Sequence, residues 1–138
     1  QCWHCRDGKG GVMEQGKAVV LFGHGARDPE WAGPMRRTAG SLQQQAPQLK
    51  VRLAFMEFMQ PTLEEVLDTL AGEGIGEVVV VPMFLAQGGH LKRDVPMLVE
   101  AARARHPTLR ITLTTAVGED SGVIEAMAAC ALGAVRTD

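Results

Sequence analysis

The stretch EVVVVP at residues 77–82 is the most hydrophobic run of the chain, and it decides the fold class. Four consecutive valines without polar alternation are typical of a strand that is buried on both faces, as in a parallel sheet covered by helices. The run AVVLFG at residues 18–23 has the same character. Both runs therefore predict strands in the interior of a parallel sheet.

Helical and strand patterns alternate around these two runs. Helices are predicted over residues 29–46, 61–74, 92–107 and 121–136, and further strands over residues 49–57 and 109–115. Four strand–helix units in one short chain predict a single α/β domain, with helices on both faces of a four-stranded parallel sheet. Right-handed crossovers and a central position for the most hydrophobic strand favour the flavodoxin-like strand order 2-1-3-4.

Composition excludes several classes of partner. The chain has 138 residues, a formal net charge of −2 and 4% aromatic residues with no tyrosine. This balance gives no general attraction to nucleic acid or to anionic lipid, and no base-stacking surface. No apolar run approaches the roughly 20 residues of a membrane span. We therefore expect a cytoplasmic protein that binds neither nucleic acid nor membrane.

The cysteines divide into two groups. Cys2 and Cys5 form a C-x-x-C motif in the glycine-rich start of the chain, which would suit a redox pair or half of a zinc site. Because no second ligand pair follows, residues 1–12 are interpreted as a tag remnant or leader, and residues 13–138 as the domain. Cys130 lies on the last apolar helix and is expected to be a small core residue.

Three polar side chains follow strands that end at the same edge of the predicted sheet. His24 stands between two glycines directly after the first strand, Glu57 ends the second strand, and His90 follows the third in a glycine-rich loop. Neighbouring strands lie only about 4.8 Å apart, and ligands bind at the carboxyl ends of strands where the strand order switches. These three side chains are therefore expected to converge.

Two imidazoles and a carboxylate suit a borderline divalent metal ion such as cobalt, nickel, iron or zinc, and an imidazole also accepts protons near neutral pH. Each residue has a plainer interpretation as well. His24 and His90 could hydrogen-bond a neighbouring loop, and Glu57 could cap the second helix. The same edge is bordered by three cations, Arg27, Lys92 and Arg93. They could bind an anionic substrate, or they could simply be charges exposed to solvent.

Four segments resemble the short CbiX-type sirohydrochlorin chelatases, which belong to the ATP-independent, class II chelatases. They are LFGHGARDPE at 21–30, AFMEFMQPTLEEVLDTL at 54–70, VVVVPMFLAQGGHLKRDVPMLVEAARARHP at 78–107 and VGED at 117–120. The resemblance implies insertion of a divalent metal ion, Co²⁺ first and Ni²⁺ or Fe²⁺ as alternatives, into sirohydrochlorin without ATP. The pathway would be that of cobalamin, sirohaem or a nickel tetrapyrrole.

The same resemblance implies roles for individual residues. His24 would be the proton acceptor and a metal ligand, and His90 the second metal ligand. The loop of Leu85, Ala86, Gln87, Gly88 and Gly89 would lie against the macrocycle. From the chemistry of a flat ring rich in carboxylates, Phe84, Leu85 and Met56 are expected as apolar walls. Arg27 and Glu57 are expected as further substrate contacts at the same edge. Gln60 stands where some relatives carry a substrate-contacting glutamate, so this contact loses its charge here.

Two other classes of function compete with the chelatase. The same histidines would serve a binding module that carries a metal ion or a tetrapyrrole without joining them. A histidine-dependent phosphoryl transfer enzyme is disfavoured, because Gly23 precedes the histidine where such enzymes have arginine. Since one four-stranded domain offers only one open edge to a large flat ring, we expect a two-fold homodimer that holds the macrocycle between two such edges.

Overall fold

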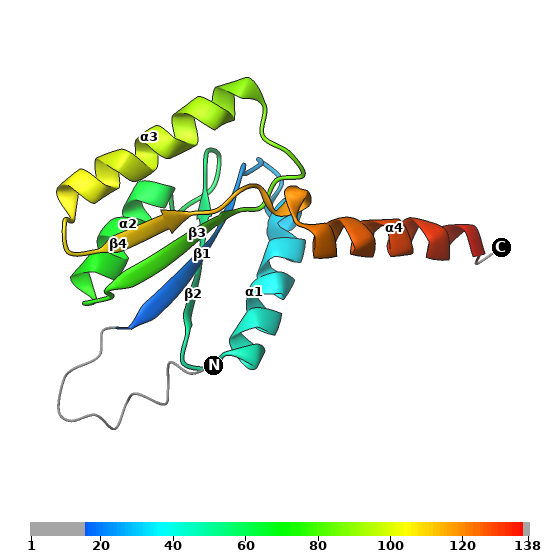
Figure 1. The fold of residues 1–138 in the computed structure, drawn as a ribbon, viewed down its shortest axis with the longest axis horizontal. Coiled ribbons are helices and arrows are strands. Elements are labelled where there is room, and N and C mark those ends of the chain that lie inside the picture. Colours follow the sequence, from blue (N-terminus) through cyan, green and yellow to red (C-terminus); the bar gives the residue numbers. More distant parts are fainter. Residues whose placement is uncertain (1–15, 137–138) are drawn as a thin grey trace.

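The computed structural model describes residues 16–136, so the predictions for residues 1–12, with Cys2 and Cys5, lie outside the described part. Strands and helices alternate along the chain (Figure 1). The strands are β1 (Lys17–Gly23), β2 (Lys50–Phe55), β3 (Glu77–Pro82) and β4 (Arg110–Leu113). The helices are α1 (Gly33–Gln45), α2 (Leu63–Gly72), α3 (Gly89–Arg105) and α4 (Ser121–Arg136), with short 3₁₀ turns η2 (Pro29–Ala32) and η3 (Val117–Glu119).

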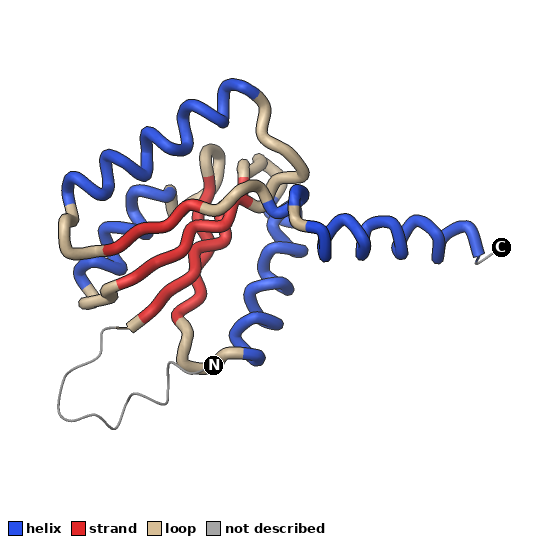
Figure 2. The backbone as a smooth tube through the Cα atoms, viewed as in Figure 1, coloured by secondary structure: helices blue, strands red, loops and turns tan. Residues whose placement is uncertain are grey.

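The sheet has the predicted topology. Its four strands are parallel and lie in the order β2-β1-β3-β4, so the order 2-1-3-4 is confirmed. The register pairs Gly23 at the end of β1 with Phe55 at the end of β2, and Phe22 with Pro82 of β3. The carboxyl ends of these three strands therefore lie at one edge, which we call the rim (Figure 2).

Helices cover both faces of the sheet, as predicted. Helices α2 and α3 pack on one face over a large apolar core, and α1 packs on the other over a smaller one. The buried members of the first core are Ala18, Val20, Phe22, Ala54, Leu63, Val66, Leu67, Leu70, Ile75, Val78, Val80, Val95, Val99, Ala102, Leu109 and Ile111. Those of the second are Leu21, Ala32, Met35 and Phe55.

Local sequence sets the bounds of the helices near the rim. Thr62 caps α2 through a capping box, in which its hydroxyl accepts from the Glu65 amide while the Glu65 carboxylate accepts from the Thr62 amide. The predicted helix at residues 29–46 begins instead with η2, because Asp28 caps that short turn and α1 starts only at Gly33. The third helix begins at Gly89, three residues before its predicted start at Lys92.

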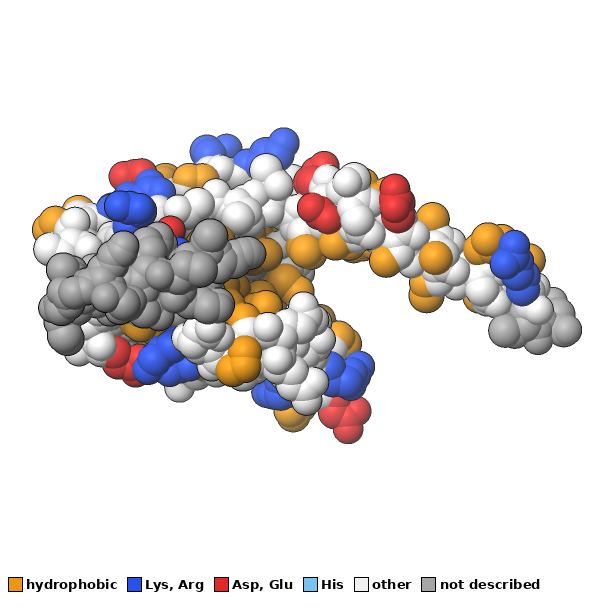
Figure 3. Space-filling view, turned by 60° about the horizontal axis from the view of Figure 1, so that its bottom comes forward, with side chains coloured by type: hydrophobic (Ala, Val, Ile, Leu, Met, Phe, Trp, Pro, Cys, Tyr) orange, Lys and Arg blue, Asp and Glu red, His pale blue; other side chains and the backbone are white. Residues whose placement is uncertain are grey.

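The last helix departs from expectation. Helix α4 extends away from the sheet instead of covering it (Figure 1), and none of its sixteen described residues is buried. Cys130, expected in the core, is exposed, so that prediction is wrong. The space-filling view shows hydrophobic side chains along α4 and on the floor of a hollow beside α1 (Figure 3). Within residues 16–136, no helix is long and apolar enough to cross a membrane.

Candidate functional site

The rim extends the β1–β2 ladder beyond the strands themselves. The Met56 amide donates to the Gly23 carbonyl at 2.9 Å, and the Glu57 amide donates to the His24 carbonyl at 3.0 Å. These two bonds continue the parallel pairing for two further residues. His24 and Glu57 are thus held side by side by the backbone, independently of their side chains.

The side chains of His24 and Glu57 also meet. His24 Nε2 lies 2.8 Å from Glu57 Oε2, and both side chains are about half exposed, at 47% and 50%. An ionised carboxylate only accepts hydrogen bonds, so Nε2 carries the proton in this pair. In the neutral imidazole, Nδ1 then carries the lone pair, and it has no hydrogen-bond partner among the described residues. That nitrogen is available to bind a metal ion or a proton.

The glycines around His24 permit a close approach of two segments. Gly25 has φ +96°, and a Cβ atom there would lie 1.9 Å from the Glu57 carbonyl oxygen. A Cβ atom at Gly23 would lie 2.5 Å from Met35 Sδ. Only glycine fits at either position without a shift of its neighbours. The G-H-G motif therefore places the histidine against the segment that carries Glu57.

His90 forms a second, separate pair. It lies in the first turn of α3 instead of in the preceding loop, it is 78% exposed, and its Nε2 lies 3.0 Å from Asp94 Oδ2. Within residues 16–136, no three His, Cys, Asp or Glu side chains are close enough together to hold a metal ion. The structure thus joins His24 to Glu57, but it does not bring His90 to that pair.

The two glycines before His90 are not required by the backbone geometry. Gly88 is the N-cap of α3 with φ −73°, and a Cβ atom at Gly88 or Gly89 would meet nothing within 4 Å. Neither position requires glycine for a turn. Asp94 was missed as a partner of His90, although its i,i+4 spacing on a helix was a usable signal.

The VGED segment at residues 117–120 contacts the start of the Leu85–Gly89 loop and supports it. The Gly118 amide donates to the Phe84 carbonyl at 2.9 Å, and a Cβ atom at Gly118 would lie 2.1 Å from the Leu85 carbonyl oxygen. Leu85 itself is 70% exposed, Ala86 is exposed and Gln87 is half-buried. An exposed leucine on a supported loop presents an apolar contact at the rim.

The loop after β2 carries two further predicted contacts. Gln60 is exposed and precedes Pro61 in a cis peptide bond. Arg27 stacks over the Phe58 ring, with its guanidinium carbon 4.5 Å from the ring centre. Phe58 is 54% exposed and has φ +67°, which is unusual for a bulky residue. This stacking could not be predicted from the sequence, because residue type does not indicate a positive φ at phenylalanine.

A mostly apolar pocket lies between α2, α3 and the carboxyl ends of β1 and β2, and neither His24 nor Glu57 lines it. It has a volume of about 180 Å³ and is lined by Phe22, Phe55, Met56, Thr62, Leu63, Glu64 and Leu98. Phe84, expected as an apolar wall, packs edge-on against Phe22 with ring centres 6.0 Å apart. The predicted walls Met56 and Phe84 are thus partly buried against the core, whereas Leu85 is open to solvent.

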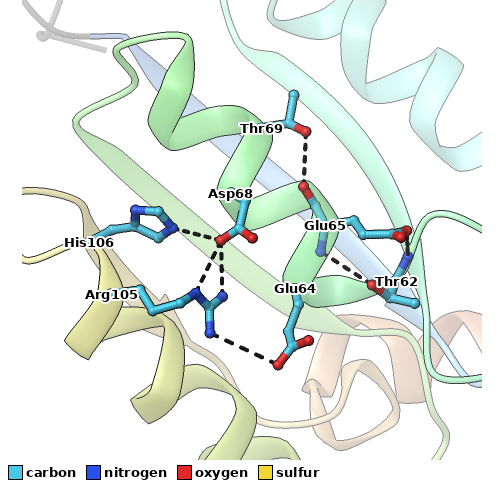
Figure 4. Close-up of polar contacts among 7 residues, drawn as sticks. All are labelled: Thr62, Glu64, Glu65, Asp68, Thr69, Arg105 and His106. Carbon is cyan, nitrogen blue, oxygen red and sulfur yellow. Dashed lines mark hydrogen bonds and ion pairs between the residues drawn. The ribbon is translucent and has the colours of Figure 1, made fainter.

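His106 provides an internal comparison. It caps the carboxyl end of α3, and its Nε2 lies 2.6 Å from Asp68 Oδ1 of α2, with Arg105 Nη2 3.0 Å from the same oxygen (Figure 4). The hydrogen bond from His106, assisted by Arg105, holds the pKa of the Asp68 carboxyl below its usual 3.8 despite some burial. The pairing of a histidine with a carboxylate therefore does not by itself identify a functional site. The position at the rim distinguishes His24 and His90.

Comparison with known proteins gives consistent matches. The CbiX family model matches residues 18–131. The sirohydrochlorin cobaltochelatase of Methanopyrus kandleri is 39% identical over 82 residues, which are 59% of this chain and 57% of that protein. The sirohydrochlorin cobaltochelatase of Methanococcus aeolicus is 34% identical over 83 residues, 60% of this chain and 58% of that protein. The matched segment thus spans little more than half the length of these curated relatives.

Solved structures share the fold. A protein from Marinobacter aquaeolei VT8, described as CbiX of cobalamin (vitamin B12) biosynthesis, superposes with a TM-score of 0.78 at 26% identity, over 88% of this chain and 99% of that one. The sirohydrochlorin chelatase SirB of Bacillus subtilis, solved with cobalt, superposes with a TM-score of 0.71 at 24% identity, over 83% of this chain and 49% of that one. Because the CbiX family model covers residues 18–131, which are most of the sequence, the chain belongs to the CbiX family.

Proposed function

We propose that the chain is a sirohydrochlorin chelatase, which inserts a divalent metal ion into the macrocycle without ATP. Cobalt is the first candidate metal, and nickel and iron are the alternatives. Family membership and relatives named sirohydrochlorin cobaltochelatase support this reaction. The observation that carries it is the His24–Glu57 pair at the rim, with His24 Nδ1 available. A cytoplasmic location is part of the same proposal.

Insertion exchanges one metal ion for the two protons of the pyrrole nitrogens. His24 Nδ1 first binds the ion, and after the ion has passed to the ring the same nitrogen accepts a released proton. Glu57, 2.8 Å from Nε2, fixes the tautomer and stabilises the resulting imidazolium. The second proton leaves to solvent, since the pair is half exposed. A site that must pass its metal ion on binds the ion through few protein ligands, so that the ion can be released.

His90 is the proposed second metal ligand. Its Nε2 faces Asp94, so Nδ1 is the nitrogen that would bind the ion. His90 lies in the first turn of α3, and this turn follows directly after the Leu85–Gly89 loop. A shift of this segment toward His24 on metal binding is therefore part of the proposal.

The macrocycle is flat, apolar over its faces and rich in carboxylates at its edge. The exposed Leu85 and the loop up to Gly89 would lie against a face of the ring. Arg27, held over Phe58, and the exposed Lys92 and Arg93 would meet the carboxylates. Gln60 would offer an amide at the rim in place of a charged contact.

The working unit in this proposal is a homodimer, with the macrocycle held between two facing rims. One rim presents one His24–Glu57 pair and one His90, which cannot enclose a large ring. A two-fold arrangement would place both copies of each residue around one cavity.

The test is metal insertion by the purified chain. Cobalt and sirohydrochlorin are mixed with the protein, and the absorption band of the metallated ring is followed over many turnovers. His24→Ala should reduce the rate by at least about 10²-fold, the contribution expected of a positioned base. His106→Ala is the matched control, because it removes a carboxylate-paired histidine from the opposite end of α3. It should insert cobalt at the parent rate.

Two results would contradict the proposal. A parent protein that binds cobalt or sirohydrochlorin but never turns over would indicate a carrier module. A His24→Ala variant as active as His106→Ala would show that the site lies elsewhere.

A further inference from the structure

Trp31 is a large aromatic side chain that stays partly open to solvent near the rim. It lies in η2, between the loop that follows His24 and the start of α1, and it is 40% exposed. Tryptophan is buried over most of its surface in the average folded domain, because its apolar area is large. Trp31 therefore leaves an unusual amount of aromatic surface uncovered.

The indole lies against both strands that carry the candidate site. A Cβ atom at Gly23, the last residue of β1, would lie 3.2 Å from Trp31 Cη2. The Phe55 ring at the end of β2 meets the indole edge-on, with ring centres 6.5 Å apart. Gly23 directly precedes His24. Phe55 lies two residues before Glu57 and belongs to the core on the α1 face. The indole is thus a neighbour of the His24–Glu57 pair on the α1 side of the rim.

Turn η2 fixes the backbone of Trp31. Asp28 caps the turn, since its carboxylate accepts from the Glu30 amide at 3.0 Å and its carbonyl accepts from the Trp31 amide at 3.0 Å. Pro29 occupies the first position of the turn, where its restricted φ is already suitable. The exposed part of the indole is therefore presented from an ordered turn that is packed on the strand ends.

The indole also has a hydrogen to donate. Among residues 16–136, no acceptor for Trp31 Nε1 is present. An indole N–H that is enclosed in a protein core is normally paired. An unpaired N–H on a partly exposed ring can instead donate to a ligand. Trp31 thus combines a flat apolar surface with one polar donor.

We propose that Trp31 is a substrate-binding residue, whose indole packs against a face of sirohydrochlorin while its N–H donates to a peripheral carboxylate. The assignment rests on the proposed function, which supplies the ring. A flat tetrapyrrole has the two features that such a side chain recognises, an extended apolar face and carboxylates at its edge. Leu85 offers an apolar contact after β3, and Trp31 adds one at the ends of β1 and β2.

Binding of metal-free sirohydrochlorin to the purified full chain tests this role. No cobalt is added, and the fluorescence of the ring reports the dissociation constant. Trp31→Leu keeps an apolar side chain against Gly23 and Phe55 but removes the flat surface and the N–H. It should raise the dissociation constant by at least about 10-fold. Trp31→Phe keeps a flat ring and loses the N–H, so it should raise the constant by about 3-fold.

Met97→Ala is the control, because Met97 is a large hydrophobic residue that is 67% exposed on α3, about two turns beyond Gly89. It should bind the ring as tightly as the parent. In the insertion assay both Trp31 variants should raise KM and keep kcat within about 2-fold of the parent, the pattern of a contact that only binds. A merely structural role would displace His24 through Gly23 and lower kcat as well.

Equal dissociation constants for the parent and Trp31→Leu would overturn the assignment. A Trp31→Leu variant whose kcat falls as far as its affinity would overturn it too, since the indole would then only support the backbone of His24. A parent that binds the ring, with the variants in the expected order, but never inserts cobalt would contradict the proposed function and leave the assignment of Trp31 intact.

Discussion

Replacing Gly25 with alanine tests whether the rim is organised as its geometry indicates. The new Cβ atom would start 1.9 Å from the Glu57 carbonyl oxygen, whereas real Cβ atoms stay beyond 3.0 Å from such neighbours. The segment with Glu57 must therefore move by about 1 Å or more. That movement breaks the 3.0 Å bond between the Glu57 amide and the His24 carbonyl, and it disturbs the 2.8 Å side-chain pair.

The magnitude follows from these changes. An alanine at φ +96° costs about 1–2 kcal/mol in backbone strain. Each hydrogen bond lost adds about 0.5–1.5 kcal/mol. With the backbone bond and the side-chain pair both lost, we expect the free energy of unfolding to fall by about 2–5 kcal/mol in total. Because displacement of a reacting group by about 1 Å can cost about 10²-fold in rate, metal insertion should fall by about that factor.

The chain offers a matched control in Gly74. This residue also has positive φ, +83°, but a Cβ atom there would meet nothing within 4 Å. Gly74→Ala should lose only the strain term, about 1–2 kcal/mol, and keep the parent rate. Urea denaturation gives the two free energies, and the absorption assay gives the two rates. Equal destabilisation of both variants together with a parent-like rate for Gly25→Ala would refute the reasoning.

Two further predictions concern other parts of the molecule. Gly118→Ala should push Leu85 outward, since its Cβ atom would lie 2.1 Å from the Leu85 oxygen; KM for sirohydrochlorin should rise more than kcat falls, and an unchanged KM would contradict the role of that loop. Asp68 has a lowered pKa in the folded state, so its ionised form stabilises the fold above pH 3.8, and this stabilisation is lost as the pH falls through the lowered pKa. The destabilisation caused by Asp68→Asn should therefore be present at pH 5 and shrink below pH 3.8 in urea denaturation. A difference that stays constant across this range would show that His106 and Arg105 do not act on the carboxylate charge.

The sheet could be predicted from the sequence because the hydrophobicity of each strand indicates how deeply the strand is buried. The valine run of β3 has only one place in a parallel sheet, next to β1, and the order 2-1-3-4 followed from it. The proximity of His24 and Glu57 was predictable for the same reason, since both end adjacent strands. The predicted approach of His90 failed because the helix begins at Gly89 and carries the imidazole into its own pair with Asp94.

The behaviour of α4 was not predictable from its residues. An apolar helix with a small cysteine has the composition of a core element, and the sequence assigned Cys130 to the core on that basis. The composition shows that the helix is apolar, but it does not indicate whether the helix packs on the sheet of its own chain. That outcome depends on the direction set by η3 and Asp120, which is a property of backbone geometry.

The two additional hydrogen bonds of the β1–β2 ladder also bear on local stability. The Met56 and Glu57 amides are hydrogen-bonded as extensions of the sheet. Separating the backbone of His24 from that of Glu57 therefore requires breaking the last hydrogen bonds between the two segments. Local openings of this kind share the high free energy of core strands and not the low free energy of surface loops. We therefore expect the Met56 and Glu57 amides to exchange more slowly than amides of a surface loop that lack such bonds. His90, in the first turn of a helix, can reorganise without disturbing it.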